Sequence, residues 1–409
     1  MAPVRGWGAG EVPESLVQYL IVFATAALVT FATTPLVRRV ALKTGAIDHP
    51  SDRKVHPKPT ATLGGLAIYL GVVAALGLTY LLPDGKALYR SSSELLAALV
   101  AGTALVVLGV YDDAKGTIPV AKLAGQVLSA GILVLMGVQL LYVWFPGQGM
   151  ISLSSDLSVP LTILWVLAMV NAVNLIDGLD GLAAGIVVVA SLSFFAFVYR
   201  APGLFGDLAP GALLSAITAG AALGFLPWNF NPAKIFMGDS GAMLLGLLLA
   251  VATISGVGRN AYPPSGGDVA AFSIPVLLPL IVLAIPFLDV ALAIVRRVKK
   301  RRPVSHADKG HIHHRLLDMG HSHRQAVLLM YLWSALISGC ALTVAFVNGR
   351  VKVAIIDSLL LLAFAATFFP RMLAGNGRSG NGRSGNGQAA KRTGAKDAKE
   401  GSTDARQSV

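Results

Sequence analysis

Residues 159–199 read VPLTILWVLAMVNAVNLIDGLDGLAAGIVVVASLSFFAFVY, which is two long apolar runs joined by a polar turn. The runs cover 159–176 and 182–199, and each can cross about 30 Å of hydrocarbon as an α-helix. Helices are expected because lipid offers backbone N–H and C=O groups no other hydrogen-bond partner. This stretch therefore predicts two membrane-spanning helices with a polar connection at one membrane surface.

The same pattern recurs through most of the chain. Of its 409 residues, 55% are hydrophobic and 13% are charged, whereas an ordinary soluble domain carries roughly 25% charged residues. A chain of this composition needs lipid as its solvent. We predict an all-α, polytopic membrane protein with about 11 transmembrane helices. The expected spans lie near 16–37, 63–82, 94–111, 120–143, 159–176, 182–199, 210–228, 241–257, 271–295, 325–347 and 353–369.

The basic residues indicate how these helices are oriented. The loops after the first, third, fifth, seventh and ninth spans and the C-terminal tail together hold 26 of the 33 Lys and Arg residues. Basic loops stay in the cytoplasm, so we expect the N-terminus outside and the C-terminus in the cytoplasm. This placement explains the net charge of +12 without a nucleic-acid partner. The predicted division is a short extracytoplasmic segment (1–15), a transmembrane domain (16–370) and a disordered, Gly-rich, basic cytoplasmic tail (371–409).

The first inner loop combines basic residues with a helix start. Arg53, Lys54 and His56 precede Gly64-Gly65, where the second span begins. A basic loop that leads into a helix N-terminus is suited to an anionic phosphate. The alternative is plain positive-inside anchoring, which explains the charge but not the accompanying His, Pro and Gly pattern.

Two adjacent carboxylates, Asp112 and Asp113, end the third span at the membrane edge. They repel each other and lose hydration there, so they need a cation or protons. A divalent ion bound through a diphosphate is a fitting partner, since Mg²⁺ is usually held by one or two carboxylates plus phosphate oxygens. A solvated helix end is the alternative, although acids are unfavourable at a helix C-terminus.

The turn quoted at the outset carries a polar stripe. Asn171, Asn174 and Asp177 are spaced by three and share one helical face, and Asp180 follows within DGLDG. Polar groups are costly against lipid, so this face meets protein, water or a ligand. Hydrogen bonding between helices is the alternative, but it does not account for the turn.

The fourth inner loop reads FLPWNFNPAKIFMGDSG over 225–241. Asp239 sits among glycines, which allow a ligand to approach the backbone closely. Asn229 and Lys234 are further polar candidates. Asp239 acting only as the cap of the following helix is the alternative reading.

The fifth inner loop holds a histidine cluster, His311, His313 and His314, next to Arg315. A zinc site is the weaker interpretation, because histidines at i and i+2 do not share a helix face and no cysteine is near. We favour a cationic, hydrogen-bonding pocket for a substrate phosphate or sugar.

Together these strings resemble a known family. They are RKVHPKP with its following GG, DDAK, NAVNLIDGLDGLAAG, FLPWNFNPAKIFMGDSG and HIHHRLLDMGHSHRQ, and they span Asp48 to Gln325. In this order they resemble the polyprenyl-phosphate N-acetylhexosamine-1-phosphate transferases, in the WecA/TagO branch. The sister branch, which transfers phospho-N-acetylmuramoyl-pentapeptide for peptidoglycan, shares the acidic motifs but differs in the histidine loop. It remains the runner-up.

The resemblance implies an enzyme of the cell membrane with its active site on the cytoplasmic face. Such an enzyme transfers N-acetylglucosamine 1-phosphate from UDP-N-acetylglucosamine to undecaprenyl or decaprenyl phosphate, releases UMP, and uses Mg²⁺, with Mn²⁺ as an alternative ion. This is the first membrane step of a cell-envelope polysaccharide. A homodimer is compatible with these features.

The resemblance also assigns roles to single residues. It assigns Asp239 to the metal, Asp112 and Asp113 to the reacting phosphates, and the histidine motif to the sugar-phosphate. Our hypothesis is that Asp112 orients or deprotonates the lipid phosphate while Asp113 supports the metal site. Asn174, Asp177 and Asp180 fall at the nucleotide-sugar site. His314, with Arg53 and Lys54, would screen the repulsion between the two anionic substrates. The sequence leaves open a covalent aspartyl-phosphate route.

A secondary transporter is the rival from another functional class. Its sites usually lie near the bilayer midplane, on broken helices in repeated halves. The polar clusters here instead fall at the inner ends of the spans, and no internal repeat is visible in the sequence.

Overall fold

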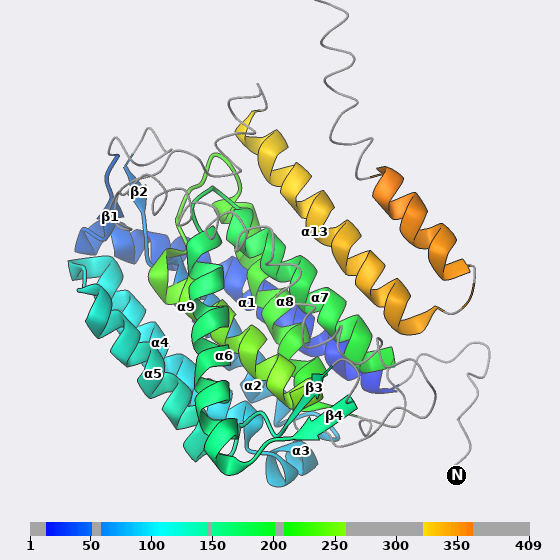
Figure 1. The fold of residues 1–409 in the computed structure, drawn as a ribbon. Helices are drawn as coiled ribbons and strands as arrows, with labels where there is room; N and C mark the ends of the chain where they lie inside the picture. The colour runs from blue at the N-terminus through cyan, green and yellow to red at the C-terminus, as the bar shows by residue number, and fades with distance from the viewer. Residues whose placement is uncertain are drawn as a thin grey trace, which may run out of the picture. The chain divides into compact units, whose positions relative to one another are not determined.

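The structure, a computed structural model, describes residues 14–50, 59–145, 149–200, 208–258, 322–347, 349 and 351–362. Within these ranges the regular secondary structure is helical, including a helix over 351–362, apart from two short antiparallel strand pairs (Figure 1). The helices are α1 (Glu14–Thr44), α2 (Gly64–Thr79), α3 (Gly85–Ser91), α4 (Glu94–Lys115), α5 (Pro119–Leu135), α6 (Ser155–Ile176), α7 (Leu182–Arg200), α8 (Pro210–Asn229), α9 (Gly238–Thr253) and α13 (His323–Phe346), with a π-helical turn η1 at Ile254–Gly258. The strand pairs join β1 (Ile47–Asp48) with β2 (Thr60–Ala61) and β3 (Tyr142–Phe145) with β4 (Gly149–Ser152).

The expected membrane architecture is confirmed in its main feature. Seven of the described helices are long and apolar enough to cross a membrane, and α2 and α5 are shorter apolar helices. Every expected span coincides with a helix at least in part, apart from 271–295, which lies outside the described residues. Residues 1–13 of the expected N-terminal segment 1–15 and the whole expected tail 371–409 also lie outside them.

The expected span 120–143 ends early, and the cause is local. Helix α5 stops at Leu135, and Gly137 follows with a left-handed φ of 85°. The N–H of Gly137 bonds to the Val134 carbonyl at 2.9 Å and that of Val138 to the Leu133 carbonyl at 2.8 Å. This is the Schellman pattern that ends a helix at glycine, so the apolar residues that follow leave the helix and lead into β3.

Helix α9 is the central helix of the described fold. All residues from Ser240 to Thr253 are buried, as expected for a helix that is apolar on every side. It packs against α2, α4, α6 and α8 (Figure 1). The polar residues at its N-terminal end are therefore surrounded by several other helices.

Glycines allow two of those helices to approach the start of α9 closely. A Cβ added to Gly65 on α2 would collide with Ser240 and Gly241, and one added to Gly109 on α4 would collide with the Ser240 backbone. The Gly64-Gly65 pair, which the sequence suggested for a phosphate, thus serves a helix–helix contact. This close packing fixes the backbone position of Asp239 at the start of α9.

Candidate active site

The polar ends of the helices meet around the start of α9. The segment before α9 runs beside β2, where the Phe236 N–H bonds to the Ala61 carbonyl at 2.8 Å. The N–H groups of Gly64 and Gly65 then bond to the Phe236 and Met237 carbonyls at 3.0 and 2.8 Å. The contacts described below join four polar segments that are far apart in the sequence, and they also include the start of α13.

Asp113 on α4 caps the N-terminus of α9. Its Oδ1 accepts from the backbone N–H of Asp239 at 2.8 Å, and its Oδ2 accepts from the Ser240 N–H at 3.3 Å and the Ser240 hydroxyl at 2.8 Å. Gly238 adopts a φ of 70°, and a Cβ there would collide with the Asp113 carboxylate. The alternative that Asp239 caps α9 is therefore wrong, and the carboxylate of Asp239 is left for other partners.

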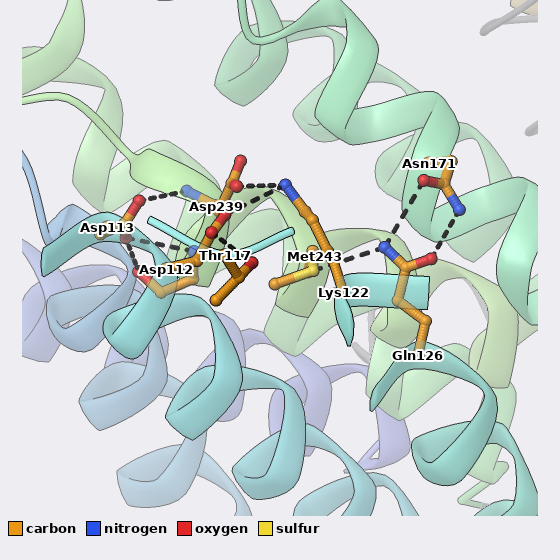
Figure 2. A network of polar contacts seen from close by, with 9 residues as sticks. Asp112, Asp113, Thr117, Lys122, Gln126, Asn171, Asp239 and Met243 are labelled. Atoms are coloured by element: carbon orange, nitrogen blue, oxygen red, sulfur yellow. Dashed lines mark hydrogen bonds and ion pairs between the residues drawn. The ribbon is translucent and has the colours of Figure 1, made fainter. Parts of the chain in front are cut away.

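Those partners form a charged cluster, which we call the Lys122 cluster: Asp112, Lys122, Asn174 and Asp239. Figure 2 shows Asp112, Lys122 and Asp239 of this cluster. The Lys122 ammonium forms an ion pair with Asp239 Oδ2 and lies 3.4 Å from Asp112 Oδ2. Thr117 donates its hydroxyl to Asp112 Oδ1 at 2.5 Å. These side chains come from α4, α5, α6 and α9, so the tertiary fold alone brings them together.

Asn174 completes the cluster from α6. With its amide nitrogen facing the carboxylate, it donates to Asp239 Oδ1 at 2.7 Å, and its oxygen accepts from the Lys122 ammonium at 3.2 Å. The hydrogen-bond network decides this orientation, because the opposite one pairs acceptor with acceptor. The predicted site residues Asp112, Asn174 and Asp239 therefore lie together.

Asp177 follows α6 directly and adds a further acid. Burial, together with the negative charges of Asp239, Asp113 and Asp180, raises the pKa of Asp177 to about 7. Several carboxylates that lie near one another, with Lys122 as the ammonium paired to them among the described residues, favour the arrival of additional positive charge.

The described residues fit a Mg²⁺ ion. They contain no group of three or more His, Cys, Asp or Glu side chains arranged as a complete metal cage. Mg²⁺ needs no such cage, because it takes one or two carboxylates and completes its shell with phosphate oxygens and water. The Lys122 ammonium between Asp112 and Asp239 shows that a cation is stabilised at this position.

Asp180 and Asn229 hold the neighbouring loop in place. Asp180 Oδ2 accepts from Asn231 Nδ2 at 2.9 Å and from the Ala233 N–H at 3.0 Å. The Asn229 side chain is 1% exposed; it accepts from the Gly181 N–H at 3.0 Å and donates to the Ile235 carbonyl at 3.1 Å. Both side chains tie the DGLDG turn to the segment that leads into α9.

The start of α13 is attached to the same loop. Arg324 Nε donates to the Asn231 carbonyl at 2.8 Å, and the Tyr331 hydroxyl donates to the Gly181 carbonyl. A capping box between Ser322 and Gln325 begins the helix. The predicted site residues of the first and fifth inner loops lie outside the described residues: Arg53, Lys54, His56, His311, His313, His314 and Arg315.

Two further predicted residues lie in other surroundings. Asn171 donates to Gln126 Oε1 on α5 at 2.8 Å, which is the helix–helix bond considered as its alternative role (Figure 2). It also donates to the Leu167 carbonyl of its own helix at 2.8 Å. Lys234 is exposed, and its ammonium lies over the Trp228 ring at 5.0 Å from the centroid.

Sequence reasoning missed Lys122, which it counted only as one more basic residue on the inner side. A signal was available, since Lys122 lies four residues before Gln126 on one face of an otherwise apolar helix. An ionisable residue in such a helix indicates a functional site.

Comparison with known proteins agrees with this site. The model of glycosyl transferase family 4 matches residues 95–257, which contain the whole Lys122 cluster. The chain is 42% identical to the decaprenyl-phosphate N-acetylglucosaminephosphotransferase of Mycobacterium tuberculosis, over 90% of this chain and 92% of that protein. It is 37% identical to the probable undecaprenyl-phosphate N-acetylglucosaminyl 1-phosphate transferase of Bacillus subtilis, over 78% and 83%.

The sister branch is also similar, but over less of the chain. The phospho-N-acetylmuramoyl-pentapeptide-transferase of Mycobacterium bovis is 36% identical over 57% of this chain and 75% of that protein.

Proposed function

This chain belongs to glycosyl transferase family 4, and from that membership we propose that it transfers N-acetylglucosamine 1-phosphate from UDP-N-acetylglucosamine to a polyprenyl phosphate and releases UMP. Relatives that align with most of the chain carry this activity in their names. The observation that carries the proposal is the convergence of Asp112, Asn174 and Asp239 around one cation position.

The chemistry requires two anions to meet. The lipid phosphate is a monoester with a second pKa near 6, so it is largely a dianion at neutral pH and needs no strong base. One of its oxygens attacks the sugar-bearing phosphorus of the donor, and the bond from that phosphorus to the oxygen of UMP breaks. Catalysis of such a transfer is chiefly positioning and charge stabilisation.

The acidic residues divide this work between them. Asp239 is the proposed Mg²⁺ ligand, and the bound ion would neutralise charge on the diphosphate. The oxygens of Asp113 already accept three hydrogen bonds, so we assign it a positioning role through α9. Asp112 orients the lipid phosphate, beside Thr117 and Lys122.

The proposal includes a membrane arrangement. The lipid tail stays in the bilayer while its phosphate meets a water-soluble nucleotide sugar, so the site belongs at a membrane surface. The distribution of Lys and Arg supports a cytoplasmic site in the cell membrane, with about 11 spans, the N-terminus outside and the C-terminus inside.

The test is an assay with purified protein, Mg²⁺, decaprenyl or undecaprenyl phosphate, and a panel of UDP-sugars. We expect UMP to form with UDP-N-acetylglucosamine and only when the lipid is present. UMP release without lipid supports the covalent route instead. Turnover with UDP-N-acetylmuramoyl-pentapeptide alone would replace this proposal by the sister activity.

A single substitution tests the metal role. We expect Asp239→Asn to lose turnover while the protein remains folded, because the amide neither carries the charge nor binds Mg²⁺ comparably. Retained turnover in this variant removes Asp239 from the metal site.

A further inference from the structure

One basic residue lies where the proposed metal would be drawn. Lys122 reaches from α5 between the carboxylates of Asp112 and Asp239 (Figure 2). Its ammonium also donates to the Asn174 oxygen. Its side chain is 20% exposed, and those of Asp112 and Asp239 are 13% and 27% exposed. The ammonium is thus a partly desolvated counter-ion that engages Asp239 Oδ2, one of the two oxygens with which Asp239 would hold a metal.

A dication and this ammonium are unfavourable on the same carboxylate. Two like charges a few ångströms apart repel, and the repulsion doubles when one partner is divalent. Asp239 has two oxygens, and both are already engaged, one by Lys122 and one by Asn174. A metal that binds Asp239 therefore competes with the ammonium for this carboxylate.

Lysine is suited to release the carboxylate in this competition. Its charge is a compact ammonium on a flexible four-carbon stem, and α5 fixes only the base of that stem. The diphosphate of a UDP-sugar is a dianion that would offer the released ammonium a new partner beside the metal. Metal and diphosphate would then favour each other's binding, which is a coupling between two ligands.

We propose that Lys122 is an internal counter-cation that holds Asp112 and Asp239 in the substrate-free enzyme and yields Asp239 to the metal when a diphosphate provides the ammonium with another anion. This inference rests on the proposed function. In it, Lys122 suppresses binding of the metal alone and promotes binding of the metal together with the nucleotide sugar.

The test is Mn²⁺ binding to the purified full-length protein, measured by electron paramagnetic resonance without lipid acceptor, so that no turnover occurs. We expect Lys122→Met to bind Mn²⁺ alone on the order of tenfold more tightly than wild type, the effect of removing one charge about 5 Å from a dication in a water-like dielectric. Adding UDP-N-acetylglucosamine should strengthen Mn²⁺ binding in wild type and strengthen it far less in Lys122→Met.

Two further variants separate the contact from general charge. Lys122→Arg keeps the cation and should keep the weak binding of the metal alone. Lys115→Met removes an exposed ammonium that lies over the Tyr111 ring, 5.4 Å from its centroid, and should change Mn²⁺ affinity by less than about threefold. Gel filtration and thermal unfolding verify folding, and Lys122→Gln replaces Lys122→Met if that variant does not fold.

The outcomes distinguish this inference from the proposed function. Unchanged or weaker Mn²⁺ binding in folded Lys122→Met, with UMP still formed by wild type, overturns the counter-cation role alone. Absence of UMP formation by wild type with every polyprenyl phosphate overturns the proposed function, on which this inference depends.

Discussion

Replacing Asp113 by asparagine should lower the stability of the folded protein, because Asp113 acts as the cap of α9 and not as a metal ligand. The carboxylate of Asp113 accepts three hydrogen bonds from the start of α9. An asparagine has one acceptor oxygen, and its amide nitrogen would face an N–H or hydroxyl donor. At least one charge-assisted bond and the favourable contact with the helix dipole are lost.

The magnitude follows from these two losses. A hydrogen bond to a charged group contributes about 1.5–3 kcal/mol, and a charge at a partly buried helix end contributes up to about 2 kcal/mol. Since the two overlap, we expect Asp113→Asn to lower the free energy of unfolding by about 2–4 kcal/mol. For a chain of this size that corresponds to a melting temperature lower by roughly 2–5 °C.

The assay is thermal unfolding in detergent without added metal, with Asp112→Asn as the matched control. That control removes the same charge one residue away. It weakens the 3.4 Å ion pair with Lys122 and the hydrogen bond from Thr117, but it leaves intact the three hydrogen bonds that cap α9. A melting temperature of Asp113→Asn equal to that of the control, together with lost Mn²⁺ binding, would refute the cap and make Asp113 a metal ligand.

The remaining predictions concern the pH response, a helix contact and a close approach. The pKa of Asp177 is about 7 in the folded protein and about 4 when unfolded, so between these values the unfolded state binds fewer protons and stability falls as pH rises. In metal-free buffer, the melting temperature should therefore fall less between pH 5 and 8 in Asp177→Asn than in wild type. Equal slopes of melting temperature against pH in the two proteins contradict this prediction. Asn171→Leu should cost about 1 kcal/mol yet retain turnover per folded molecule, so lost turnover in a folded variant makes Asn171 a substrate residue. Gly65→Ala should lower the free energy of unfolding by about 1–3 kcal/mol and lower turnover, because it displaces the start of α9. Gly77→Ala, with nothing within 4 Å of the added Cβ, should change neither stability nor turnover. Equal stability and turnover of the two variants would contradict the close approach of α2 to α9.

Much of the architecture follows from sequence alone, because the bilayer imposes a local rule. An apolar run such as 182–199 is long enough to span hydrocarbon, and its backbone must form a helix there. The polar turn at Asp177 and Asp180 was recognisable for the same reason, since ionisable groups are costly next to lipid. The end of α5 at Leu135 was missed because the apolar run continues beyond it in the sequence. The helix stops there because Gly137 adopts a left-handed φ.

The roles of individual residues required the tertiary structure. The sequence identified Asp112, Asp113 and Asp239 as a group, but it did not show that Asp113 would hold the backbone of α9 and leave the Asp239 carboxylate to Lys122. Likewise, Asn229 was a candidate for substrate and proved to be a buried tie between two loops. Hydrophobic periodicity reports which face of a helix is buried. The partner of a buried polar group depends on how helices pack, and the two partners can be more than 100 residues apart in the sequence. Neither spacing nor composition gives information about contacts at that separation.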